Sequence, residues 1–309
     1  MRTQIRMTAV LVLLALPACG GGAGGGGRTS PFTGERGGDP GPVLAVKIDN
    51  APGARPQTGL GSADLVWAEE VEGGMSRLVG VWSGTLPDRV GPVRSARESD
   101  LELLAQLGEP VFAYSGAHEA VAARIRRAGV VAAPPGAAPG AYERDGRRAS
   151  PHNLYLRPDR LLAAVGDTAD AADAGLGFGD APERGGERAR TYEVAFPRAR
   201  FAFRWAAGEG RWRVALDGDA VDARPATVVV QRVTVRESAL RDGNGNPTPY
   251  TETVGSGDAV VLRDGRAYEG RWARPEKGAG TEFTTPEGEP LRFARGPVWI
   301  VLDAADAAD

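Results

Sequence analysis

The chain has 309 residues, of which 42% are hydrophobic and 25% charged, with a net charge of −3. This composition is typical of globular proteins of one or two domains, and the near-neutral charge gives no basis for nucleic-acid binding. The chain has one cysteine, so an intramolecular disulfide is excluded and stability must come from a packed core.

The first residues have the pattern of a bacterial lipoprotein signal. A basic start and an apolar run from Met7 to Leu16 lead to a small residue, Ala18, directly before Cys19. We predict a signal peptide over 1–18 and lipidation of Cys19. Such a lipid would anchor an extracytoplasmic protein to the membrane, because buried acyl chains contribute about 0.8 kcal/mol per CH₂. An ordinary secreted protein with an incidental cysteine is the alternative.

The next segments predict a tether followed by an α/β domain. Residues 19–42 are glycine-rich and polar, which predicts a flexible tether without a core. Strands and helices that alternate along the chain then predict an α/β domain with a mixed sheet over 43–168. Its strands are expected over 43–48, 65–71, 76–83 and 111–115, and its helices over 99–107, 117–128 and 158–165.

The second half of the chain has a different pattern. Residues 169–190 lose apolar periodicity, which predicts a linker. Short strand-like runs separated by turns such as Asp217-Gly218 and Asp264-Gly265 predict a mainly β domain over 191–302, followed by a disordered tail over 303–309. The runs are 201–205, 212–216, 227–235, 259–262, 267–272 and 298–302. The predicted fold class is therefore α+β or α/β, an N-terminal α/β domain with a mainly β C-terminal domain.

The ordered part resembles the YerB-like bacterial lipoproteins, a two-domain family of unknown function. Its motifs occur here in matching order. They are Asp49-Asn50, Ala54 to Leu60, Ala63 to Val66, Glu72-Gly73-Gly74, Gly91 to Arg97, Ser150 to Tyr155, Val228 to Gln231, Val254 to Gly257, Gly270 to Trp272 and Gly296 to Ile300. The resemblance implies the two-domain architecture and a lipid-anchored location, and it implies no activity.

The segment around Arg94 and Arg97 is the first candidate site. Ser95 with Glu98, or Ser99 with Glu102, fits the capping box of a helix N-terminus, where backbone N–H groups favour anions. We predict an anion-binding cleft for a carboxylate or phosphate that arginine binds bidentately. Its predicted residues are Asp49, Arg55, Arg77, Arg94, Ser95, Arg97, His152 and Asn153. Alternatively, these arginines pair internally with Asp49, Asp64, Glu69 and Glu72 and fasten the sheet to the helix.

The acidic cluster of Glu69, Glu70 and Glu72 is the second candidate site. Two carboxylates at a strand end can serve as acid and base in glycoside hydrolysis, and His152 could assist them. Solvated or salt-bridged carboxylates are the alternative, so no catalytic residue is assigned. With two histidines and one cysteine, neither a metal site nor a cofactor is expected.

These features predict a non-enzymatic binding or scaffold protein of the cell envelope, extracytoplasmic and lipid-anchored to the cell membrane. Its expected partners are the membrane, through Cys19, and a cell-wall polymer or envelope protein, with no nucleic acid. The alternative is a cell-wall glycan or peptide hydrolase or transferase that uses Glu69 or Glu72 with His152.

Overall fold

The computed structural model describes residues 28–37, 41–242 and 245–305, so Cys19 and the predicted signal peptide lie outside the described residues. The strands of the N-terminal half are β1 (Leu44–Asp49), β2 (Leu65–Val71), β3 (Met75–Trp82), β4 (Val111–Ala113), β5 (Val131–Ala133), β6 (Tyr142–Arg144) and β7 (Leu154–Leu156). The first four lie where the apolar runs predict strands. The last three are too short to give a periodic pattern.

The predicted helices are present, the first two shorter than predicted and the third with its predicted bounds. They are α1 (Asp100–Leu104), which a 3₁₀ turn continues to Leu107, α2 (Glu119–Ile125) and α3 (Pro158–Val165). Neither predicted capping box forms at α1, and this prediction is wrong. The Ser99 hydroxyl donates to the buried carboxylate of Glu69 instead of capping the helix, and the Ser95 hydroxyl lies 3.4 Å from that of Ser115.

The C-terminal half consists of strands. They are β8 (Glu187–Arg188), β9 (Thr191–Phe196), β10 (Ala199–Ala206), β11 (Arg211–Leu216), β12 (Asp219–Val221), β13 (Thr227–Val233), β14 (Val235–Arg241), β15 (Pro247–Thr251), β16 (Gly255–Arg263), β17 (Arg266–Arg274), β18 (Glu282–Thr284) and β19 (Val298–Ala304). Both predicted two-residue turns close hairpins, with positive φ at Asp217 and Gly218 and at Asp264 and Gly265. β19 continues through Ala304, so the prediction of a disordered tail is wrong at residues 303–304, and residues 306–309 lie outside the described residues.

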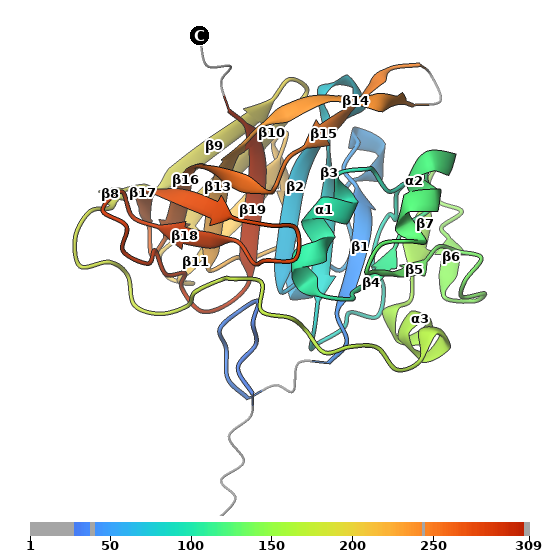
Figure 1. Cartoon of the computed structure of the whole chain (residues 1–309), viewed down its shortest axis with the longest axis horizontal. Helices are drawn as coiled ribbons and strands as arrows, with labels where there is room; N and C mark the ends of the chain where they lie inside the picture. Colours follow the sequence, from blue (N-terminus) through green and yellow to red (C-terminus); the bar gives the residue numbers. More distant parts are fainter. Residues whose placement is uncertain (1–27, 38–40, 243–244, 306–309) are drawn as a thin grey trace, which may run out of the picture.

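Both halves of the chain contribute strands to one 11-stranded mixed sheet (Figure 1). Its strand order is β18-β17-β16-β13-β19-β2-β3-β1-β4-β5, and β8 pairs with β17. The halves join where β19 runs parallel to β2, with Ile300 opposite Trp67. The prediction of a mixed N-terminal sheet followed by a mainly β C-terminal region is confirmed. The structure adds that the helices are few and that the C-terminal strands pair largely antiparallel.

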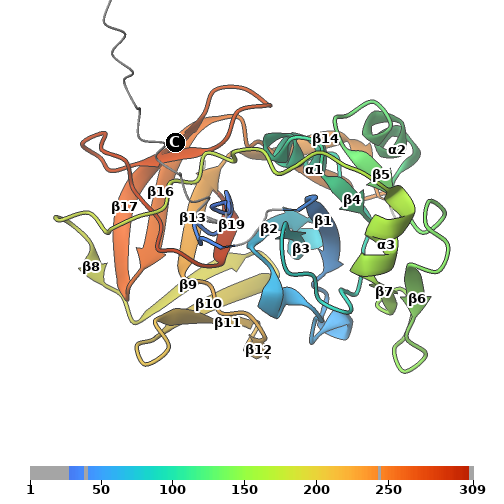
Figure 2. The ribbon, with the colours of Figure 1, turned by 90° about the horizontal axis from the view of Figure 1, so that it is seen from below.

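Two hydrophobic cores cover the two faces of this sheet, because successive side chains along each strand point to opposite faces. On one face, Val66, Val228 and Trp299 pack with the four-stranded sheet β12-β11-β10-β9 and with α3. On the other face, a second core contains Trp67 and Val229 and lies under the apolar side chains of α1 and α2. Figure 2 shows the four-stranded sheet below the large sheet and α1 and α2 above it.

Segments that were predicted to stay outside the core contribute to it. Phe32, in the predicted tether, is fully buried, and the Thr33 carbonyl accepts a hydrogen bond from Gly296 N. Ala174 and Leu176, in the predicted linker, are buried in the same core. The prediction of a core-free tether is therefore wrong at Phe32, and the predicted linker contributes Ala174 and Leu176 to the core. In the part of the chain described, no helix has the length and apolar character to cross a bilayer.

Candidate functional site

The arginine-containing segment is held against the ends of β1 and β3. Arg94 N donates to the carbonyl of Lys47, and Ala96 N donates to Gly116. In the sheet, Asp49 at the end of β1 lies opposite Arg77 of β3. This pairing brings the side chains of residues 94–97 beside the charged ends of both strands.

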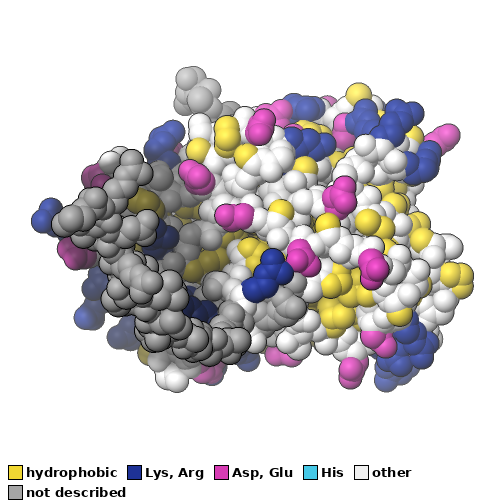
Figure 3. Space-filling view, turned by 60° about the horizontal axis from the view of Figure 1, so that its bottom comes forward, with side chains coloured by type: hydrophobic (Ala, Val, Ile, Leu, Met, Phe, Trp, Pro, Cys, Tyr) yellow, Lys and Arg dark blue, Asp and Glu magenta, His cyan; other side chains and the backbone are white. Residues whose placement is uncertain are grey.

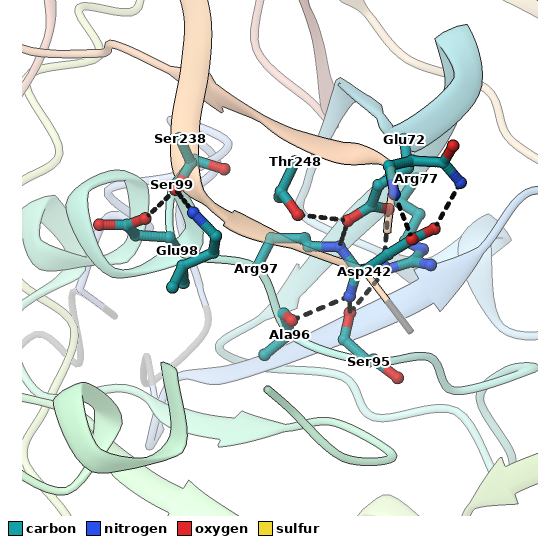
Figure 4. Close-up of polar contacts among 12 residues, drawn as sticks. Glu72, Arg77, Ser95, Ala96, Arg97, Glu98, Ser99, Ser238, Asp242 and Thr248 are labelled. Atoms are coloured by element: carbon teal, nitrogen blue, oxygen red, sulfur yellow. Dashed lines mark hydrogen bonds and ion pairs between the residues drawn. The ribbon is translucent and has the colours of Figure 1, made fainter. Parts of the chain in front are cut away.

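Arg97 forms a two-point ion pair with Glu72, which follows β2 directly. Its Nε lies 2.6 Å from Oε1, and its Nη2 donates to Oε2 at 2.7 Å. Thr248 of β15 donates a third contact to the carboxylate at 3.0 Å, as Figure 4 shows. Burial alone would raise the pKa of Glu72, but the hydrogen bond and charge of Arg97 outweigh it and lower this pKa. Glu72 is therefore held as a carboxylate, and its two oxygens already have Arg97 and Thr248 as partners.

Asp49 is shared by Arg94 and His152. One oxygen of this buried carboxylate lies 3.1 Å from Arg94 Nε and 2.8 Å from His152 Nδ1. The side chains of Arg94 and His152 remain 24% and 26% exposed, so this edge of the cluster is open to solvent. Here the geometry brings together three of the residues expected from the sequence.

Arg77 lies between these two ion pairs and is buried. Its Nη1 donates to the carbonyl of Ser95 at 3.0 Å, and the same carbonyl accepts from Arg97. Burial and the positive charges of Arg97 and Arg94 lower the pKa of Arg77 to about 10, against the opposing effect of Glu72. Arg77 is thus close enough to Arg97 and Arg94 for their charges to oppose its own, and the carboxylates of Glu72 and Asp49 partly offset this repulsion.

Two of the expected residues point elsewhere. Arg55 donates to Asn50 and to the carbonyl of Leu216, and its Nη2 lies 2.6 Å from Asp217 in the β11–β12 turn. Asn153 accepts from Arg144 at 2.7 Å. Arg55 therefore links the two sheets, and the expectation that it joins the other arginines is wrong.

Glu69 has an environment that sequence reasoning did not anticipate. It is fully buried in contact with Lys47 and Ser99, and Lys47 also lies 2.6 Å from Asp100. Burial raises the pKa of Glu69, and the charge of Lys47 opposes this shift. A lysine within an apolar strand was the signal that could have revealed this cluster.

Two surface grooves of the described residues are lined by other residues than the arginine cluster and the Lys47 cluster. One, of about 660 Å³, is lined by residues of β13, β16 and β17, including Arg232 and Trp272. Another, of about 1150 Å³, is lined by residues 178–187, by residues 267–269 of β17 and by residues within 285–292. Within the described residues, no group of three His, Cys, Asp or Glu side chains could hold a metal ion. On the face in Figure 3, acidic and basic side chains are interspersed.

Comparison with known proteins places the sequence motifs in a family context. Two family models, described as "Protein of unknown function (DUF3048)" N-terminal and C-terminal domains, match residues 32–172 and 192–300. The protein "Putative lipoprotein YerB" of Bacillus subtilis (strain 168) is 47% identical over 55 residues, which is 18% of this chain and 17% of that relative. The matched segment thus spans about a sixth of the relative's length.

The fold has a counterpart of known structure. The crystal structure of YerB from Bacillus subtilis superposes with a TM-score of 0.76 over 89% of this chain and 96% of that chain, at 20% identity. At this identity, the likeness concerns the fold alone. Together, the family matches and this superposition confirm the YerB-like resemblance inferred from the motifs.

Proposed function

This chain belongs to the DUF3048 family of unknown function, and we propose that it is a lipid-anchored, extracytoplasmic, non-enzymatic protein that binds an anionic group at Arg94. The name of its Bacillus subtilis relative, "Putative lipoprotein YerB", supports the anchor at Cys19. The observation that carries the binding role is the crowding of Arg77, Arg94 and Arg97 around Glu72 and Asp49. Burial first, and then the charges of Arg97 and Arg94, lower the pKa of Arg77 to about 10.

The charge balance of this cluster favours an anion. Glu72 neutralises Arg97 by direct contact, and Asp49 is divided between Arg94 and His152. The buried Arg77 donates a hydrogen bond to the carbonyl oxygen of Ser95, which carries no full negative charge. An added carboxylate or phosphate would reduce the repulsion among the three guanidinium groups, which is strengthened where water is partly excluded.

Arg94 is the arginine that a ligand could reach. Arg97 and Arg77 are both largely buried and bonded, whereas the Arg94 side chain is 24% exposed and contacts Asp49 through Nε. Its two terminal nitrogens can form the planar fork that recognises carboxylate and phosphate. His152 contacts the same Asp49 oxygen as Arg94, so it would border the bound anion.

The carboxylates support binding more than hydrolysis. Glu69 is fully buried against Lys47 and Asp100, so a glycan could not reach it without opening the core. The lowered pKa of Glu72 opposes a role as a general acid, which requires a proton at neutral pH. Neither residue therefore has the exposure and protonation state that a glycosidase pair needs.

Calorimetry of the full-length protein with anionic wall polymers and cell-wall peptide fragments would test the proposal. We expect binding that Arg94→Ala abolishes and that Arg94→Lys partly retains, because lysine keeps the charge and loses the fork. Arg213→Ala, which removes an exposed arginine of the outer sheet, should bind normally. Mass spectrometry of the ligands should detect no turnover.

Three results would contradict this function. Equal binding by wild type and Arg94→Ala would place the ligand elsewhere. Absence of binding to every probe, in a folded protein, would favour a purely structural role for the arginine cluster. Turnover that Glu72→Gln removes would instead identify an enzyme.

A further inference from the structure

The buried cluster of Lys47, Glu69 and Asp100 has the composition of a site for covalent cross-linking. Lys47 of β1 lies on the sheet face that α1 covers, and each of the three side chains has 0% exposure. Lys47 contacts Glu69, and its Nζ lies 2.6 Å from Oδ1 of Asp100. An amine and a carboxyl group are thus held in contact where water is excluded.

The choice of lysine at this position is informative. Lys47 is one of two lysines among 37 basic residues, and the other, Lys277, is exposed. Arginine is ordinarily the residue preferred for buried ion pairs, whereas a lysine amine can lose its proton and act as a nucleophile. The chain therefore has its one buried amine beside two carboxyl groups.

Burial disfavours the fully ionised form of this cluster. One ammonium and two carboxylates carry an uncompensated negative charge, which is costly in a water-free interior. Burial accordingly raises the pKa of Glu69. Transfer of a proton from Lys47 to a neighbouring carboxyl group gives the neutral amine and acid that amide formation requires.

The contacts of the two carboxyl groups assign them different roles. Oδ2 of Asp100 accepts a hydrogen bond from Arg97 N at 2.6 Å, which would stabilise negative charge on this oxygen during attack at Cγ. Glu69 contacts the Lys47 amine and is positioned by the Ser99 hydroxyl at 3.0 Å. Asp100 is therefore suited to be the electrophile, and Glu69 is suited to move a proton.

We propose that Lys47 and Asp100 form an intramolecular isopeptide bond, with Glu69 as the proton relay. Glu69 holds the proton that Lys47 has released. The neutral Lys47 amine attacks Cγ of Asp100 as Glu69 passes this proton to Oδ1, and a C–N bond forms. Glu69 takes a proton from the nitrogen and delivers it to the departing oxygen, Oδ1. The C–O bond breaks, one water molecule leaves and Glu69 is regenerated, so no oxidant or co-reactant is needed.

The product would join β1 covalently to α1. Such a bond constrains the unfolded chain across a separation of 53 residues, in the way that a disulfide does. This chain has one cysteine and so cannot form an intramolecular disulfide. It would also replace a buried ion pair by a neutral amide and thereby remove the cost of burying those charges.

Peptide mapping of the full-length protein, isolated from membranes and digested with trypsin under denaturing conditions, tests the proposal. Trypsin cannot cleave after an acylated lysine, and it does not cleave the Arg55–Pro56 bond. We expect the peptide 37–77 to remain uncut at Lys47 and to be joined to peptide 98–124, with the combined mass lowered by one water molecule. Recovery of residues 37–47 and 98–124 as separate, unmodified peptides would overturn the proposal.

Variants test the assigned roles. Lys47→Arg keeps the charge and should give only separate peptides, whereas Lys277→Arg should leave the cross-link unchanged. Glu69→Gln retains both reacting groups and should abolish or strongly slow cross-linking, and complete cross-linking in this variant would overturn the relay. A water loss confined to peptide 37–77 would mean that Lys47 bonds to Glu69, and would overturn the assignment of Asp100. Because the wild-type map decides the central point, the test does not depend on any variant folding.

Discussion

Glu72 and Arg97 face each other in a two-point ion pair across 25 residues of sequence, with contacts of 2.6 and 2.7 Å. Glu72 follows β2, and Arg97 precedes α1, so the pair connects the end of the sheet to the helix above it. Thr248 of β15 donates to the same carboxylate. One ion pair therefore fastens three parts of the chain that are distant in sequence.

Arg97→Ala is expected to destabilise the protein by about 2–3 kcal/mol, because Glu72 would remain as a largely buried carboxylate without its partner. The estimate lies at the low end for buried pairs, since the Arg97 side chain is 15% exposed. Urea unfolding monitored by tryptophan fluorescence measures the change. Arg213→Ala, at an exposed ion pair, is the control and should leave the midpoint unchanged. Equal midpoints for the two variants would mean that the Glu72–Arg97 pair contributes nothing.

The strands were largely predictable from the sequence, because their apolar patterns are local. β2 lies over the predicted residues 65–71, and β10 and β11 contain the predicted runs. The continuity of the large sheet was not predictable. Nothing local in the sequence indicates that β19 pairs with β2, because the two strands are separated by most of the chain.

The candidate site was predictable as a set of residues but not as a set of contacts. The motifs identified Asp49, Arg94 and His152, which meet in the structure. They could not show that Arg55 pairs with Asp217, 162 positions further along the chain. In a chain with so many arginines, the choice of partner is decided by tertiary packing.

Glu102→Gln should reduce stability at neutral pH and have less effect in acid. Burial alone would raise the pKa of Glu102, but hydrogen bonds from Thr253, Tyr250 and Val254 outweigh it and lower this pKa below 4.5. A lowered carboxyl pKa contributes stability above the unfolded value, and this contribution is lost as the pH falls through the folded value. The expected loss at neutral pH is about 1–2 kcal/mol, reduced by partial solvent screening.

Urea unfolding of wild type and Glu102→Gln across a pH series would measure this effect. The difference between the two proteins should be constant above pH 4.5 and shrink below it. A difference that does not depend on pH would show that the ionised form of Glu102 contributes no stability.

Ile300→Ala should destabilise both family regions together. Ile300 is 2% exposed on β19, between β13 and β2, so its truncation leaves a cavity at the joint of the large sheet. Such truncations cost about 2–5 kcal/mol. Hydrogen exchange should accelerate in both β3 and β16, because these strands belong to the same sheet. Acceleration confined to β16 would indicate two regions that unfold independently.

Gly280→Ala should loosen the segment that was predicted to be a linker. A Cβ at Gly280 would lie 2.3 Å from the backbone of Ala174, whose carbonyl accepts a hydrogen bond from Thr281 N. Because backbone atoms cannot rotate away as a flexible side chain can, the two segments must separate, at a cost of about 1–3 kcal/mol. Gly278→Ala is the matched control, since a Cβ there meets nothing within 4 Å. Limited proteolysis should therefore cleave residues 169–181 faster in Gly280→Ala than in wild type or Gly278→Ala. Equal cleavage rates in all three proteins would mean that this segment is not held by the contact at Gly280.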